Sequence, residues 1–215
     1  MIQFPVTVTR TVVFGAACWA LSVVFFLDQA IVQLAFARPY SLQTNLISDL
    51  GNTACGPDIC SPLHTFMNAT FIAVGLLHWA GAVATWRAWP SGGPSVAGKV
   101  VLAFAGWCLA YAGANPENLR PALHTFGAVG GLISLNLAMI LLGMAVVGAA
   151  RWLGGMALVA GIVGLVGFGL LLSGGVGLPI GVTERIADYP GAAMIVVLGI
   201  FLLGWAVQSR TRLKT

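Results

Sequence analysis

The chain has 215 residues, of which 59% are hydrophobic and only 7% are charged. A soluble domain carries about 25% charged residues, so this composition excludes a water-exposed globular surface. The net charge of +4 does not indicate nucleic-acid binding, because the basic residues stand singly at the ends of apolar segments and form no patch. The composition therefore predicts an all-α membrane protein.

Six apolar segments are long enough to cross a bilayer, which takes about 20 residues of helix. Breakers separate them, such as the Arg38-Pro39 pair and the glycine-rich segment Gly174–Gly181. We expect one transmembrane domain over residues 1–215, a six-helix bundle. Its predicted spans are Val12–Ala37, Leu63–Trp86, Ala97–Gly113, Pro121–Ala149, Trp152–Ser173 and Tyr189–Val207.

The charged residues predict an orientation for this bundle. With the N-terminus in the cytoplasm, the cytoplasmic loops and ends carry only basic residues, and the outer loops carry nearly all the acids, as the positive-inside rule requires. The cytoplasmic residues are then Arg10, Arg87, Lys99, Arg151, Arg210, Arg212 and Lys214. We expect a multi-pass protein of the bacterial cytoplasmic (inner) membrane with both termini in the cytoplasm and its functional site facing outward.

A short motif recurs where two of the even-numbered spans begin. Leu63–Phe66 and Leu123–Phe126 both read Leu-His-Thr-Phe, and a weaker third member, Ala187–Gly191, is predicted to open the sixth span. In that third member Asp188 is expected to cap the helix and Pro190 to lie in its first turn, where proline is favoured. The chain is interpreted as three tandem helix hairpins.

The two histidines of this motif are candidates for chemistry. His64 and His124 fall in the first turns of their helices, where the helix dipole disfavours the imidazolium. A neutral imidazole suits a metal ligand or a general base. With Asp49, Glu117 or Glu184 they would form an open site for a divalent metal such as zinc. The alternative is that both histidines simply bond loop backbone at the helix starts.

The polar residues of the outer loops also carry a family resemblance. Ser48–Gly51 reads Ser-Asp-Leu-Gly, a histidine opens the second helix, Asn115-Pro116 precedes His124, and Glu184-Arg185 precedes the predicted sixth span. This pattern resembles the six-helix bacterial integral-membrane family filed as domain of unknown function 998, over nearly the whole chain. The resemblance implies six helices and an outward polar cluster, and it brings no established activity.

Other polar residues are expected to contribute to the same outward pocket. A carboxylate inside the first span, Asp28, is costly unless it binds a ligand or pairs within the bundle. The acid–arginine pairs of the outer loops would either grip a lipid headgroup through arginine or only order the loops. The ligand-binding candidates are Asp28, Asn68, Glu117, Arg120 and Arg185, and the catalytic candidates are His64, His124, Asp49 and Glu184.

Cys55 and Cys60 lie five residues apart around a Gly-Pro turn in the first outer loop. On the oxidising side of a membrane such a pair is expected to form a disulfide that braces the loop.

The sequence thus leads to one main functional hypothesis. An outward polar pocket binds a lipid-like or small amphipathic molecule, with membrane lipids as the surroundings, and a metal-assisted hydrolase or transferase reaction is one form this function takes. The alternatives are a non-enzymatic accessory subunit that packs against partner membrane subunits, and a small-molecule transporter, which should show broken helices around a midplane site.

Overall fold

The structure is a computed structural model that describes residues 9–212, and the described chain is all-α, as expected. Six helical segments are long and apolar enough to cross a membrane, which confirms the predicted number of spans. The α-helices are α1 (Arg10–Leu21), α2 (Val24–Leu34), α3 (His64–Ala84), α4 (Gly93–Ala114), α5 (Pro121–Val146), α6 (Arg151–Leu172) and α7 (Ile180–Arg212), with short 3-10 turns η1 (Ser48–Gly51) and η2 (Trp86–Ala88).

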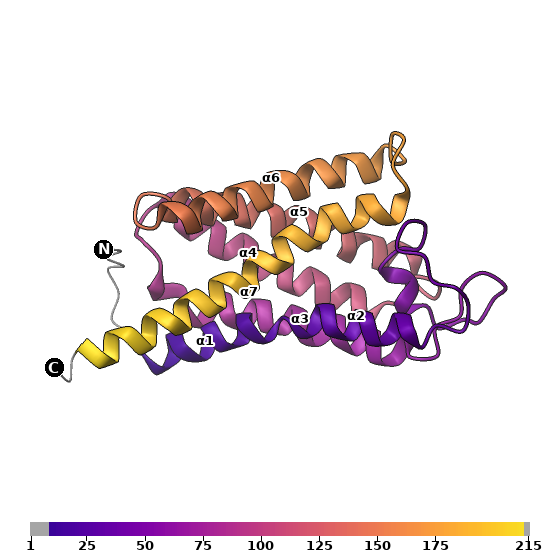
Figure 1. Ribbon diagram of the computed structural model, residues 1–215, viewed down its shortest axis with the longest axis horizontal. Coiled ribbons are helices and arrows are strands. Elements are labelled where there is room, and N and C mark those ends of the chain that lie inside the picture. The colour runs from indigo at the N-terminus through magenta and orange to yellow at the C-terminus, as the bar shows by residue number, and fades with distance from the viewer. Residues whose placement is uncertain (1–8, 213–215) are drawn as a thin grey trace.

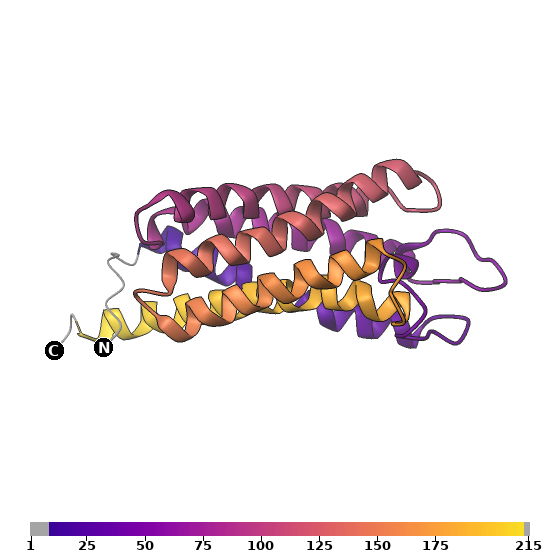
Figure 2. The same cartoon turned by 90° about the horizontal axis from the view of Figure 1, so that it is seen from above.

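The helices are arranged as a ring. In the order α1, α3, α4, α5, α6 and α7, each helix packs against the next, and α7 packs against α1 to close the ring. α1 begins and α7 ends at the same end of the bundle, which we call the terminal end (Figure 1). The long connection between α2 and α3 extends beyond the opposite end, which we call the disulfide end (Figure 2).

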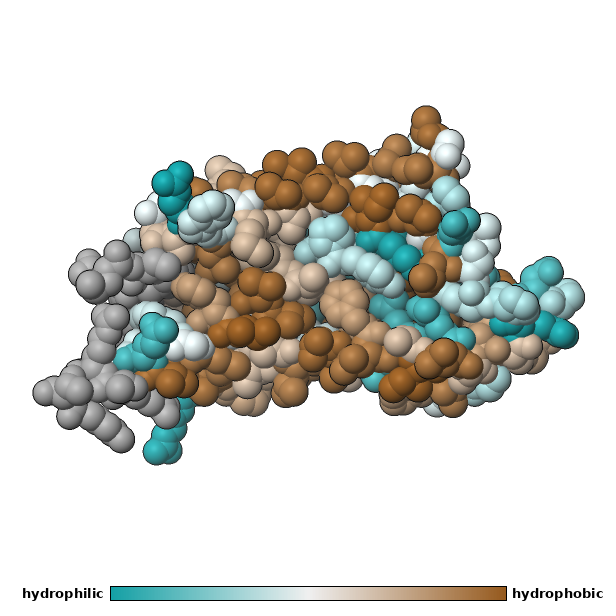
Figure 3. Space-filling view, viewed as in Figure 1, coloured by the Kyte–Doolittle hydropathy of each residue, from teal (hydrophilic) through white to brown (hydrophobic). Residues whose placement is uncertain are grey.

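On the face seen in Figure 3 the outside of the ring is largely apolar, with hydrophilic residues at the two ends and in a recessed patch in the half toward the disulfide end. Large apolar side chains point outward here, including Leu34, which is 89% exposed, and Trp152, which is 82% exposed. Such a surface is unfavourable in water and suited to lipid. The fold is that of an integral membrane protein.

The first span is one continuous apolar segment in the sequence but two helices in the structure. Between α1 and α2 the N–H of Ser22 bonds the carbonyl of Trp19, a tighter three-residue spacing, and the Ser22 hydroxyl donates to the carbonyl of Cys18. A serine that bonds back in this way bends a helix. The bend lets α1 pack on α7 while α2 follows α3.

The last helix begins earlier than predicted. α7 starts at Ile180, so Glu184, Arg185 and Asp188 lie inside the helix, Asp188 is not a cap, and Pro190 is an interior proline. An interior proline has no N–H to give the preceding turn and crowds it. Across the bundle, Asn136 of α5 donates its amide to the carbonyl of Ala187 in that turn. This contact supports the turns of α7 that precede Tyr189, the residue at which the predicted span began.

Candidate functional site

A cavity of about 300 Å³ lies inside the ring, toward the disulfide end. Every transmembrane helix of the ring except α1 contributes residues to it, and residues 46–48 of the long connection cover it at the disulfide end. Its polar lining residues are Ser48, His78, Glu117, His124, Thr125, Glu184 and Asp188.

The wall of this cavity is mostly apolar. Phe25 comes from α2, Phe71 and Val74 from α3, Leu109 from α4 and Phe168 from α6. Phe25 packs against Phe71, with ring centroids 6.2 Å apart. Small-molecule sites are typically apolar clefts with a few well-placed polar groups, and this cavity has that composition.

Two of the carboxyl groups come from one face of α7. Glu184, Asp188 and the cavity-lining Ala192 follow one another at intervals of four residues, so they are stacked on the same side of the helix. Glu184 accepts a hydrogen bond from the backbone N–H of Ile47, which connects α7 to the segment that covers the cavity. The earlier start of α7 is what places both carboxyls inside the bundle.

The third carboxyl, Glu117, comes from the short connection between α4 and α5 and is partly buried. Burial raises its pKa above the ordinary value of 4.5, and the negative charge of Asp49 raises it further. A hydrogen bond with Ser48 and the nearby imidazole of His124 oppose that rise in pKa. Glu117 therefore holds its proton to a higher pH than a free glutamate does.

His124 faces this carboxyl from the first turn of α5. Its side chain is only 7% exposed, and its Nδ1 lies 3.0 Å from the carbonyl of Asn115 and 3.2 Å from that of Ala112. Because carbonyls only accept hydrogen bonds, Nδ1 carries a proton. In the neutral ring the other nitrogen, Nε2, is then the one that accepts a proton or a hydrogen bond.

The predicted pocket residue Arg185 has a different role. Its Nη1 donates to the carbonyls of Leu42, Asn45 and Gly181, at 3.1, 2.8 and 2.8 Å, and its Nη2 donates to the Tyr40 hydroxyl at 2.6 Å. Tyr40 in turn donates to the carbonyl of Leu46. Burial raises the pKa of Tyr40, against the opposing effect of the Arg185 charge, so the phenol stays protonated and keeps this bond. Arg185 thus fastens the covering segment to α7.

Asp49 and Asn68 were also predicted for the pocket. Their hydrogen bonds instead stabilise the connection between α2 and α3, which contains the covering segment. Asp49 accepts hydrogen bonds from the backbone N–H of Leu46 and the side-chain amide of Asn45, at 2.9 and 3.1 Å. Asn68 donates from α3 to the carbonyl of Gly51 at 2.8 Å. Neither residue is among those that line the cavity in the described part of the chain.

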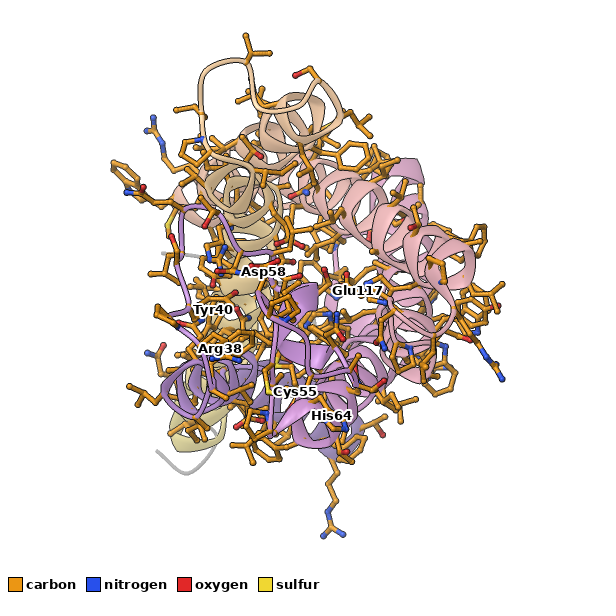
Figure 4. The ribbon with its side chains drawn as sticks, turned by 90° about the vertical axis from the view of Figure 1, so that its right-hand side faces the viewer. Arg38, Tyr40, Cys55, Asp58, His64 and Glu117 are labelled. Atoms are coloured by element: carbon orange, nitrogen blue, oxygen red, sulfur yellow. A yellow bond between two sulfur atoms is a disulfide. The ribbon has the colours of Figure 1, made fainter. Side chains whose placement is uncertain are left out.

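Three further candidates lie away from the cavity lining. Asp28 accepts a hydrogen bond from the Thr70 hydroxyl, so it is paired within the bundle. Arg120 is exposed and donates to the side chain of Asn115. His64 bonds the carbonyl of Ser61 at 2.8 Å. Viewed from the disulfide end, Glu117 lies near the middle of the bundle and His64 toward its edge (Figure 4).

The described residues do not form a metal centre. No three histidine, cysteine, aspartate or glutamate side chains among residues 9–212 are grouped so as to hold one metal ion. Both His64 and His124 instead bond backbone carbonyls near their helix starts, the alternative that the sequence left open. Cys55 and Cys60 lie at disulfide distance, as expected.

The comparison with known families agrees with this architecture. The model of the family described as "Protein of unknown function (DUF998)" matches residues 10–201. The chain belongs to this DUF998 family. The resemblance found in the sequence is thus confirmed, and the match runs from the start of the first span into the sixth. No curated protein and no solved structure matches the chain.

Four polar lining residues of this DUF998 protein were not predicted as site residues: Ser48, His78, Thr125 and Asp188. Asp188 had been read as a helix cap, although its spacing of four from Glu184 is the helical signal that places both on one face. Ser48 was noted only as part of a motif. The spacing of His78 from Phe71 and Val74 puts all three on one face of α3.

Proposed function

We propose that the cavity binds a small amphipathic molecule. The apolar part of the ligand lies against the aromatic and aliphatic wall, and its polar group, a cation or a strong hydrogen-bond donor such as a primary ammonium, meets Glu117, Glu184 and Asp188. The observation that carries the proposal is that three carboxyl groups from two separate parts of the chain line a mostly apolar cavity.

The charge of the lining determines the kind of polar group. Among the described residues that line the cavity there is no lysine or arginine, and the guanidinium of Arg185 bonds carbonyls and a phenol outside that lining. Carboxylates accept hydrogen bonds, and such bonds are strongest when the donor is cationic. A cationic ligand also offsets the mutual repulsion of the carboxylates, so amines should bind better than carboxylic acids of the same length.

The shape of the cavity favours entry from the lipid. Gly161 and Gly164 of α6 lie against Asn136 of α5, but Gly167, one turn nearer the disulfide end, lies against α7. α5 and α6 therefore separate toward that end, where the cavity reaches the outward-facing Thr125 and Leu172, the latter 68% exposed. A volume at the low end of the roughly 300–1,000 Å³ found for small-molecule sites favours a compact amphiphile over a whole diacyl lipid.

The orientation in the membrane is part of the same proposal. The basic residues Arg10, Arg87 and Arg151 lie at the terminal end, and the disulfide lies at the other end. Positive charge is retained in the cytoplasm and disulfides persist outside it. The disulfide end therefore faces outward from the bacterial cytoplasmic membrane, and the cavity receives its ligand from the outer leaflet.

A thermal-unfolding titration tests the binding function. The protein is placed in phosphatidylcholine nanodiscs and titrated with n-alkylamines, and with n-alkyl carboxylates of the same chain length. A ligand that binds only the folded state raises the unfolding temperature with its concentration. We expect the amines to stabilise the protein more than the carboxylates do.

Matched variants separate cavity binding from partition into lipid. Ala128→Phe places a ring in the cavity lining of α5, and Ile133→Phe places the same ring on the outside of that helix. Stabilisation by amines that is lost only in Ala128→Phe supports the proposal. Equal stabilisation of both variants, or none of the wild type, contradicts it.

One contact favours a second candidate function, hydrolysis or group transfer on the bound amphiphile. Ser48 lines the cavity near Glu117, close enough to oppose the rise of its pKa, and the raised pKa of Glu117 suits a proton donor or acceptor. Incubation with ester- and phosphoester-linked alkylamines, followed by mass spectrometry, tests this reading. Product formation by the wild type and by Thr53→Ala, but not by Ser48→Ala, supports catalysis, and the absence of product in all three proteins leaves binding alone.

A further inference from the structure

One histidine of the cavity lining, His78, has no part in the carboxyl site of the proposed function. His78 lies on α3, is 3% exposed, and lines the cavity on the same helix face as Phe71 and Val74. Its backbone carbonyl accepts a hydrogen bond from the Trp19 indole, so that contact leaves the imidazole ring free. The described residues give its Nε2 no hydrogen-bond partner.

Few buried side chains share this condition, and only His78 combines it with a place in the cavity. The other described side chains with an unpartnered buried atom do not line it; they are Gln29, Ser95, Asn136 and Arg185. A buried polar atom without a partner costs about 1–3 kcal/mol, and inside a bilayer there is no bulk water to supply one. A ligand group at the deep end of the cavity removes that cost.

The depth of His78 follows from its neighbours on α4. The Cβ of His78 lies against Gly106, whereas Nδ1 of His124 bonds the carbonyl of Ala112. Six residues of helix separate these two levels, which is about 9 Å along the bundle. The cavity therefore has polar groups at two levels about 9 Å apart, with His124 nearer the disulfide end and His78 deeper.

We propose that Nε2 of His78 forms an inner polar subsite, which binds a hydroxyl or similar group at the far end of the amphiphile. The inference rests on the proposed function and specifies its ligand class: a molecule with a cationic group at one end, a hydroxyl at the other, and an apolar chain or ring system between them. A hydroxyl both donates and accepts a hydrogen bond, so it matches either tautomer of the imidazole.

The test compares n-alkylamines with ω-hydroxyalkylamines over a series of chain lengths, by thermal unfolding in phosphatidylcholine nanodiscs. For the wild type, one hydrogen bond should make the hydroxylated probe bind about threefold to tenfold more tightly. This advantage should peak at the chain length that spans about 9 Å, the estimated separation of the two levels.

Variants at the deep end assign the advantage to the imidazole. His78→Phe should reverse the order of the two probes, because the hydroxyl then has no partner. His78→Gln keeps a polar group and should preserve the order. Trp79→Phe changes the next residue, which is exposed, and should leave the probe ratio unchanged. Because each variant is judged by a ratio of two probes, a general loss of stability cancels out.

The outcomes separate this inference from the proposed function. Amine binding with no hydroxyl advantage at any chain length overturns the inner subsite and leaves the proposed function standing. A hydroxyl advantage that persists in His78→Phe also overturns it. If no amine binds in the wild type, the proposed function itself fails. A length-dependent advantage that is lost in His78→Phe supports the inner subsite.

Discussion

The two Leu-His-Thr-Phe segments are identical in sequence and begin equivalent helices, yet their histidines have different surroundings. His64 follows a long connection, bonds the nearby carbonyl of Ser61, and lies toward the edge of the bundle. His124 follows a short one between two tightly packed helices, bonds the carbonyls of Ala112 and Asn115, and lines the cavity beside Glu117.

The difference between them comes from the neighbouring helix. Gly127 lies directly against Ala112, so α5 approaches α4 closely just after His124. The imidazole is therefore directed at the end of α4 and into the bundle. The motif reproduces a helix start and a histidine bonded to backbone, but it does not reproduce the site.

The largest difference is expected in ligand binding. His124→Ala should weaken n-alkylamine binding by about tenfold or more, because a hydrogen bond to a charged donor contributes about 1.5–3 kcal/mol. His64→Ala should change binding by less than about twofold, since that histidine does not line the cavity. Titration of both variants in nanodiscs checks this, and equal losses in the two would remove the distinction.

Glu117, the carboxyl beside His124, should give binding and stability opposite pH dependences. Its raised pKa means that folding favours the protonated form. The resulting stabilisation is complete below the ordinary value of 4.5 and is lost as pH rises through the folded-state pKa. Amine binding should instead strengthen over that rise, as the carboxyl ionises.

Glu117→Gln should reduce both slopes. The other titratable groups near Glu117 or in the cavity lining are Asp49, His124, Glu184 and Asp188. Unfolding temperatures measured over a pH series, with and without n-alkylamine, give both slopes. Slopes that are unchanged in Glu117→Gln would mean that this carboxyl does not control them.

The stability of the ligand-free protein should separate the two histidines less strongly. His124→Ala leaves two backbone carbonyls without their side-chain partner in a buried place and should cost about 1–3 kcal/mol. His64→Ala removes one partly exposed hydrogen bond and should cost about 0.5–1 kcal/mol. Reversible denaturant unfolding in mixed micelles measures both, and a larger loss for His64→Ala contradicts the assignment of burial.

The smallest difference is expected one residue further along. Thr125→Val removes a hydroxyl at the mouth of the cavity and should change amine affinity by at most about threefold. Thr65→Val makes the same change outside the cavity and should have no measurable effect on affinity. The same nanodisc titration checks this pair. A larger effect from Thr65→Val would place the ligand at the start of α3 and contradict the site at the start of α5.

The sequence was sufficient for the overall fold because the length and apolar composition of each span are local properties. It was not sufficient for the start of α7, because the partner that supports the turn before Pro190 is Asn136, 54 residues earlier (190 − 136). Because the predicted span began at Tyr189, Glu184 and Asp188 were not expected to lie on a common helix face.

The candidate site was predicted only in part, for a similar reason. Of the residues predicted for the pocket, Glu117, His124 and Glu184 line the cavity. Arg185 and Asp49 instead hydrogen-bond the segment that covers it. A buried polar residue needs a hydrogen-bond partner, and the sequence does not distinguish a backbone carbonyl from a ligand as that partner. The role of His64 depended on the same unknown partner.

Photolabelling with an alkylamine that carries a diazirine on its chain tests the central claim most directly. After irradiation in nanodiscs, peptide mass spectrometry locates the label on α5, where Val129 and Leu132 line the cavity and Ile133 and Leu137 face outward. We predict labelling of Val129 and Leu132 that excess unlabelled amine prevents and that Ala128→Phe abolishes. Labelling confined to Ile133 and Leu137, unaffected by competitor, would contradict an internal binding site.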